Sequence, residues 1–128
     1  VGHGETYLHP QDILWWSKGG VLHGQSPARI AFLRRVIEQA PINRLVPHDL
    51  GWDQVPCAAA APDYYLHYLG PTQSSVRDVE LPADASYTVD VVDTWEMTVE
   101  RLPQTFSGSA SIPLPGKPGL ALVIRRET

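Results

Sequence analysis

The clearest pattern in the chain is an alternation of apolar and polar residues from Tyr87 to Arg101. Its apolar members fall into two sets, first Tyr87, Val89 and Val91, and then Trp95, Met97 and Val99. A period of two is typical of β-strands that bury one face. We therefore predict two strands here and expect Trp95 and Met97 to be core residues.

The connection between these two strands decides which side chains face each other. A two-residue turn at Asp93-Thr94 would place Val91 opposite Glu96, so that apolar residues meet charged ones across the pair. A three-residue connection, Val92 to Thr94, instead places Val91 opposite Trp95 and makes one face fully apolar. We favour this hairpin, and one long bent strand is the alternative.

Two aspartates near the end of this hairpin form a carboxylate pair in the sequence. The favoured register places Asp90 on the solvent face. It places Asp93 in the turn, where an aspartate often accepts hydrogen bonds from its own backbone. We therefore interpret both residues as structural. Lys117, between two prolines, is interpreted as a solvated turn residue.

Shorter strand patterns flank the hairpin. They cover Tyr64 to Leu69, Val76 to Leu81, Phe106 to Ile112 and Leu120 to Ile124. The last of these is a continuous apolar run, which predicts a central strand buried on both faces. Six short antiparallel strands with proline and glycine turns predict a mainly β fold, a small antiparallel β-sandwich.

The first half of the chain predicts one α-helix after a loop-rich segment. Ser26-Pro27 is a typical helix start, with Ser26 as N-cap, and Pro41 ends the helix after Ala40. The expected apolar stripe contains Ile30, Phe32, Leu33, Val36, Ile37 and Ala40. Ile42 to Pro62 shows little periodicity, so we interpret it as a connection that crosses the surface or holds a short turn of helix.

Composition limits the classes of function. The 128 residues suit one principal core, and 43% hydrophobic and 19% charged residues with a net charge of -4 leave no basic patch for nucleic acid. The chain contains no apolar run near the length of a membrane span, and it does not start with a basic and then apolar signal pattern. The first residue is Val1, so we expect a piece of a longer protein.

The single cysteine, Cys57, cannot form a disulfide within the chain, and cysteine usage therefore does not indicate a compartment. No Cys-His motif surrounds it. We therefore expect a small buried hydrophobic residue there and not a nucleophile.

Two parts of the chain resemble a known group of proteins. Gly2-His3-Gly4-Glu5-Thr6-Tyr7 and Ile13 to Gly24 are similar to the end of the catalytic barrel in candidate bacterial glycoside hydrolases related to apiosidase-like enzymes. Asp93 to Thr98 and Leu114 to Pro118 resemble the β-sandwich that follows the (β/α)8 barrel in that group. The resemblance implies a C-terminal accessory domain.

The resemblance also implies how the chain is divided. Residues 1–45 would be a remnant of the barrel end, 46–62 a connection and 63–128 the C-terminal β-sandwich domain. Within the remnant, Val1 to Tyr7 would end the eighth barrel strand, Leu8 to Gln25 would form the loop after it, and Ser26 to Ala40 would be the last barrel helix.

Active sites of such barrels lie at the C-terminal ends of the strands. The resemblance therefore implies substrate-binding residues that act in an intact parent only: His3, Glu5, Tyr7, Trp15, Trp16 and His23. The first seven strands are absent, and glycosidic cleavage needs two correctly spaced carboxyl groups. We therefore assign no catalytic residue, Glu5 included.

The expected function is a non-catalytic domain that packs against the catalytic barrel of its own parent chain and buries the apolar side of the helix Pro27 to Ala40. The alternative is a carbohydrate-binding module that works alone through exposed aromatic rings. Trp15 and Trp16 would serve such stacking, or pack into the core. A third hypothesis is a metalloenzyme built on His3, Glu5 and His23, but no familiar ligand spacing is present, so we expect no cofactor.

Overall fold

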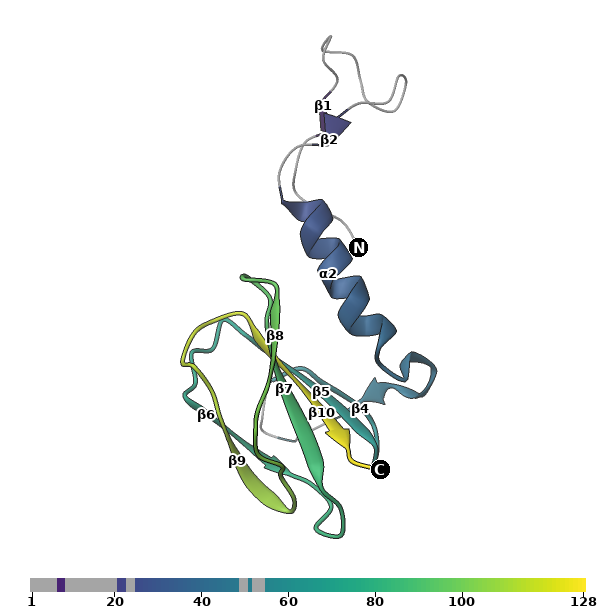
Figure 1. Ribbon diagram of the computed structural model, residues 1–128, viewed down its shortest axis with the longest axis vertical. Coiled ribbons are helices and arrows are strands. Elements are labelled where there is room, and N and C mark those ends of the chain that lie inside the picture. The colour runs from purple at the N-terminus through teal and green to yellow at the C-terminus, as the bar shows by residue number, and fades with distance from the viewer. Residues whose placement is uncertain (1–6, 9–20, 23–24, 49–50, 52–54) are drawn as a thin grey trace. The chain divides into compact units, whose positions relative to one another are not determined.

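The computed structural model describes residues 7–8, 21–22, 25–48, 51 and 55–128 (Figure 1). The chain divides into two compact units, Val1–Ile37 and Glu38–Thr128. The first unit contains strands β1 (Tyr7–Leu8) and β2 (Val21–Leu22), which pair antiparallel.

The helix α2 (Ser26–Glu38) confirms the helix predicted from Ser26-Pro27. It ends two residues before the expected Ala40. Its first backbone hydrogen bond runs from Arg29 N to Gln25 O, 3.1 Å, which places the cap one residue earlier than predicted. Phe32 is buried, whereas Leu33 is 43% exposed. The predicted apolar stripe is therefore buried only in part.

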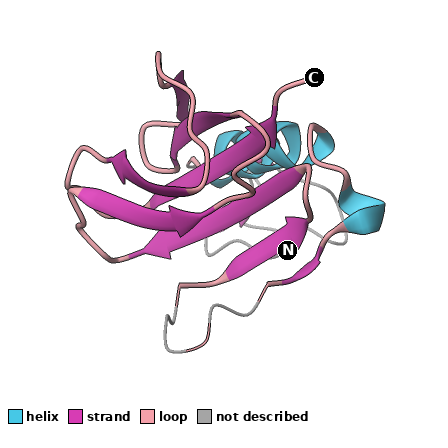
Figure 2. Ribbon diagram, turned by 90° about the horizontal axis from the view of Figure 1, so that it is seen from below, coloured by secondary structure: helices cyan, strands magenta, loops and turns pink. Residues whose placement is uncertain are grey.

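The second unit is a small antiparallel β-sandwich, which confirms the predicted fold class (Figure 2). Its larger sheet has the order β3 (Val46–Pro47), β4 (Cys57–Ala60), β5 (Tyr64–Gly70), β10 (Leu120–Arg126), β7 (Tyr87–Asp93) and β8 (Thr98–Arg101). The smaller sheet pairs β6 (Val76–Glu80) with β9 (Ser109–Pro113). A short 3-10 helix, η1 (Ile42–Arg44), precedes β3.

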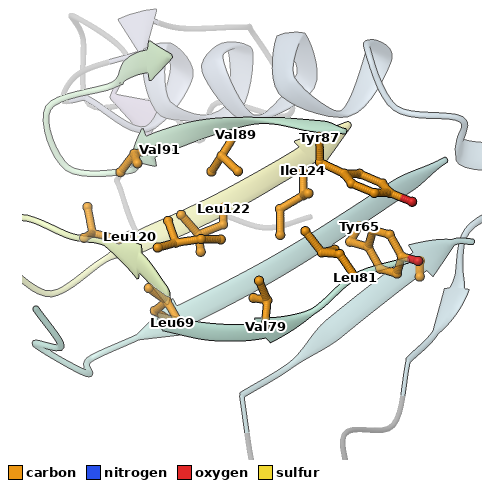
Figure 3. Packing of buried hydrophobic residues seen from close by; sticks show 12 residues of the cluster. Tyr65, Leu69, Val79, Leu81, Tyr87, Val89, Val91, Leu120, Leu122 and Ile124 are labelled. Atoms are coloured by element: carbon orange, nitrogen blue, oxygen red, sulfur yellow. The ribbon is translucent and has the colours of Figure 1, made fainter. Parts of the chain in front are cut away.

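The core lies between the two sheets. Leu120, Leu122 and Ile124 of the central strand β10 are fully buried, and they face Val79 of β6 across the core (Figure 3). Ala121 and Val123, on the other face of β10, are buried as well, at 7% and 1% exposure. The prediction of a central strand buried on both faces is therefore confirmed.

The strands β3 and β4 lie in the segment that the sequence indicated as an irregular connection. They form one edge of the larger sheet, with Ala58 to Ala60 paired against Leu66 to Tyr64 of β5. Alanine has little intrinsic preference for strands, so the pairing with an aromatic-rich neighbour decides the conformation.

The predicted register of the central hairpin was wrong. Val91 pairs with Glu100, not with Trp95, and four residues, Thr94 to Met97, connect β7 to β8. Trp95 is consequently 63% exposed, and Met97 has a positive φ of 56° and is only partly buried. Both residues belong to the loop, so they are not core residues.

Candidate functional site

The substrate-binding residues predicted from the resemblance fall in the first unit. His3, Glu5, Trp15, Trp16 and His23 lie outside the described residues. Tyr7 lies in β1, where its backbone pairs with Leu22 of β2. Their contact with a sugar therefore remains a prediction. The polar interactions that the structure describes belong to the β-sandwich.

Asp90 is a buried carboxylate between two arginines. It lies on the face of β7 opposite the core, as predicted, but it is only 6% exposed there. Arg101 Nε donates a hydrogen bond to its Oδ1 at 2.7 Å, and Arg125 Nη1 forms an ion pair with its Oδ2. Burial alone would raise the pKa of Asp90, but the hydrogen bonds and charges of the two arginines outweigh burial and lower that pKa. Asp90 is therefore an ionised structural residue.

A shallow hollow of about 470 Å³ lies beside this cluster. It is lined by Thr88, Arg101, Arg125, Arg126, Glu127 and Thr128. Two of its arginines are already paired with Asp90, and Arg126 lies 3.9 Å from an Asp63 carboxylate oxygen. The positive charge of this hollow is therefore largely balanced.

Asp93 organises the tip of the β7–β8 hairpin. Its Oδ1 accepts hydrogen bonds from Trp95 N and Glu96 N, both at 2.9 Å, so the predicted capping role is confirmed. Its Oδ2 forms an ion pair with Lys117, which is therefore more than a solvated turn residue. Burial alone would raise the pKa of Asp93, but Lys117 and the two backbone amides lower it.

The loop before β10 is hydrogen-bonded to this tip. Gly119 O accepts hydrogen bonds from Thr94 N at 3.0 Å and from Thr94 Oγ1 at 2.6 Å. Gly119 has φ 75°, and a Cβ built on it would lie 2.7 Å from Trp95 Nε1. One edge of the Trp95 ring therefore contacts the backbone of Gly119. The Trp95 side chain is nevertheless mostly exposed.

The described residues contain no arrangement typical of a metal centre. Among residues 7–8, 21–22, 25–48, 51 and 55–128, no group of three or more His, Cys, Asp or Glu side chains could hold a metal ion. Cys57 is partly buried, and its thiol donates to Val55 O at 3.2 Å. Within the same part of the chain, no helix is long and apolar enough to cross a membrane.

The interactions of Trp95 and Lys117 at the hairpin tip, and of the two arginines around Asp90, were not predicted from the sequence. Asp93 followed by Thr94 and Trp95 carried a signal for a longer loop, because an aspartate side chain can hold two successive amides. Arg101 and Arg125 carried no such signal, since they approach Asp90 from two other strands.

Fold and interactions together define a small antiparallel β-sandwich domain whose polar groups serve to stabilise it. The chain belongs to the family described as a domain of unknown function, DUF5605, which matches residues 52–125. The matched segment covers most of the sandwich. Comparison with curated proteins gave no match.

The structure is similar to parts of larger proteins. One is described as a candidate glycoside hydrolase from Bacteroides vulgatus ATCC 8482, with TM-score 0.74 and 28% sequence identity over 94% of this chain. Another is a glycoside hydrolase family 5 protein from the same organism, with TM-score 0.65 and 14% identity over 90% of this chain. The chain spans only 28% and 26% of those two proteins. The second likeness concerns the fold alone.

Proposed function

We propose that the chain is a non-catalytic accessory domain of a glycoside hydrolase and that it packs against the catalytic (β/α)8 barrel of its parent. The observation that carries the proposal is the coverage of the first comparison: nearly all of this chain aligns with 28% of a protein described as a candidate glycoside hydrolase. The remaining length of such a protein is sufficient for a barrel of about 250 residues or more. A relation to apiosidase-like enzymes is part of the same proposal.

Residues 1–45 are, in this proposal, the end of that barrel, and 63–128 are the body of the sandwich. The segment 46–62 leads from one to the other and also supplies the edge strands β3 and β4 of the larger sheet. His3, Glu5, Tyr7, Trp15, Trp16 and His23 would then contact substrate in the intact parent only. The two carboxylates that cleave the glycosidic bond would come from earlier strands of the barrel.

An apolar row on the sheet offers a surface for such packing. Tyr68, Ala121, Val92 and Val99 are aligned across β5, β10, β7 and β8, on the face opposite Leu122. Ala121 and Val92 are buried, whereas Tyr68 and Val99 are 47% and 51% exposed. Tyr68 and Val99 are therefore the parts of this row that a neighbouring domain could still cover. We infer that this row is part of the surface that packs against the barrel.

The direct test compares the 128 residues with a longer form of the chain that carries the upstream sequence. Both are assayed on plant-type oligosaccharides and aryl glycosides. We expect cleavage by the longer form alone. Cleavage by the 128 residues alone would contradict the proposal and make Glu5 the first residue to mutate.

A second test addresses packing in the longer form. Tyr68→Glu places a charge in the apolar row, and we expect it to lower the unfolding temperature of the longer form more than that of the 128 residues. Glu96→Gln, at an exposed loop position, is the control. Equal effects of Tyr68→Glu on both forms would show that the row does not pack against the barrel.

A further inference from the structure

Large apolar side chains are exposed in the stretch where helix α2 leads into the sandwich. Leu33 of α2, Ile42 of η1 and Val46 of β3 are 43%, 58% and 60% exposed. Single apolar residues scattered over a surface are normal, but these three fall within one short stretch of the chain. Such a stretch is a candidate for a surface that another part of the protein covers.

The backbone that carries Ile42 and Val46 is fixed on the sandwich. Arg44 Nη1 donates a hydrogen bond to Asp63 Oδ2 at 3.2 Å, which ties η1 to the turn before β5. Val46 pairs with Ala59 of β4, and β3 forms the edge of the larger sheet. Regular structure therefore holds both apolar side chains in solvent, and they do not belong to a loose linker.

The connection from the helix to this edge is short. Helix α2 ends at Glu38 and η1 begins at Ile42, and four residues of extended chain span at most about 14 Å. Ile42 N donates a hydrogen bond to Ala40 O at 2.8 Å, which shortens the connection further. A domain joined through so short a link has an effective concentration of roughly millimolar, well above that of a second copy in dilute solution. The domain to which α2 belongs is therefore the favoured partner for this edge.

We propose that Ile42 and Val46 form the contact through which the sandwich packs on its barrel, at the barrel face opposite to the active site. The inference rests on the proposed function, in which α2 is the last barrel helix. The active site of such a barrel lies at the C-terminal ends of the strands, and each helix runs back toward the opposite face. Since α2 has 13 residues, it is about 20 Å long. The sandwich therefore begins about one helix length away from the loop that would rim the sugar site.

This contact is distinct from the apolar row that ends at Tyr68 and Val99. Ala59, the strand partner of Val46, belongs to the core cluster together with Leu122. Directly paired residues share a face of the sheet, so Val46 lies on the core side, whereas the row lies on the opposite face. A contact at this edge stabilises the parent protein without touching its substrate.

The test uses the longer form of the chain that carries the upstream sequence. Val46→Asp places a charge in the proposed contact. Val76→Asp is the matched control, because Val76 is also an exposed strand valine, at 44%, but lies in β6 of the smaller sheet. We expect Val46→Asp to lower the unfolding temperature of the longer form by at least about 2 °C more than Val76→Asp does, and Ile42→Asp to have the same effect.

Two further measurements separate the contact from other roles. In the 128-residue chain Val46 is exposed, so Val46→Asp and Val76→Asp should have similarly small effects on the unfolding temperature. In the longer form, kcat and KM for an aryl glycoside, measured well below the unfolding temperature, should be the same for Val46→Asp as for the original chain.

Equal unfolding temperatures of Val46→Asp and Val76→Asp in the longer form would overturn the proposal. A raised KM of Val46→Asp would overturn it as well, because the contact would then lie at the catalytic face. So would a dimer of the longer form that Val46→Asp dissociates in sedimentation, because the occupant would then be a second copy. An inactive longer form would refute the proposed function and leave the comparison of unfolding temperatures readable, so each proposal can fail alone.

Discussion

Gly119→Ala is the sharpest probe of the hairpin tip, because a matched control exists in the same loop. Gly119 and Gly116 both have positive φ, 75° and 67°. A Cβ on Gly116 would meet no atom within 4 Å, whereas a Cβ on Gly119 would collide with the pyrrole edge of Trp95 and with Thr94 Oγ1. The two substitutions therefore share the backbone strain and differ in the collision.

The shared part is the cost of the left-handed conformation for alanine, about 1–2 kcal/mol in each variant. Alanine also reduces the freedom of the unfolded chain, and this gain is the same at both positions. The collision adds an overpacking cost that is typically about 1–3 kcal/mol. Because Trp95 is exposed and can turn into solvent, we expect the lower end, about 1 kcal/mol more for Gly119→Ala than for Gly116→Ala.

Urea unfolding followed by far-ultraviolet circular dichroism gives both free energies of unfolding. Equal free energies of unfolding for the two variants would refute the reasoning, because they would mean that Trp95 does not rest on Gly119.

Three further predictions concern the sandwich itself. Leu122→Ala, at a fully buried position, should cost about 3 kcal/mol, whereas Val99→Ala at the exposed edge should cost less than about 0.5 kcal/mol, both measured by urea unfolding. Asp90→Asn leaves two arginines beside a neutral amide and should lower the free energy of unfolding by about 1–2 kcal/mol. The loss is limited because Arg101 is more than half exposed and part of its charge is screened by solvent. A loss that does not change at high salt would contradict this electrostatic account. The pKa values of Asp90 and Asp93 are lowered in the folded chain, so their stabilisation is complete above the unfolded pKa of about 3.9 and is lost as the pH falls through the lower folded values. Asp93→Asn should therefore unfold with a weaker dependence on pH in that acidic range, and an unchanged dependence would contradict the assignment.

The parts of the fold that were predictable from the sequence are those where one residue type decides the structure. The continuous apolar run Leu120 to Ile124 can only be stable between two covered faces, and it forms the central strand. The edge strand Cys57–Ala60 has no comparable signal, because alanine suits many conformations and its pairing with β5 is a tertiary effect. Burial of Asp90 was not predictable from the sequence pattern either, because the two arginines that pair with it come from other strands, β8 and β10.

The hairpin illustrates why an apolar alternation alone does not determine a register. The predicted pairing assumed the shortest connection that makes one face apolar, but Asp93 holds two loop amides and extends the connection to four residues. Val91 then pairs with Glu100, which lies five residues after its predicted partner Trp95. A shift by an odd number transfers every side chain of β8 to the other face.

This transfer has two consequences for the surface of the domain. It moves Val99 from the expected core face to the opposite face, where it pairs with Val92 and completes the apolar row that ends at Tyr68. It also removes Trp95 from the strand and leaves it in the loop, supported by Gly119. Both exposed features thus follow from the loop that one carboxylate holds. Asp93→Ala leaves the loop amides of Trp95 and Glu96 without their acceptor and should therefore lower the free energy of unfolding by more than Val99→Ala does. Equal values for the two variants in urea unfolding would show that the loop does not need this carboxylate.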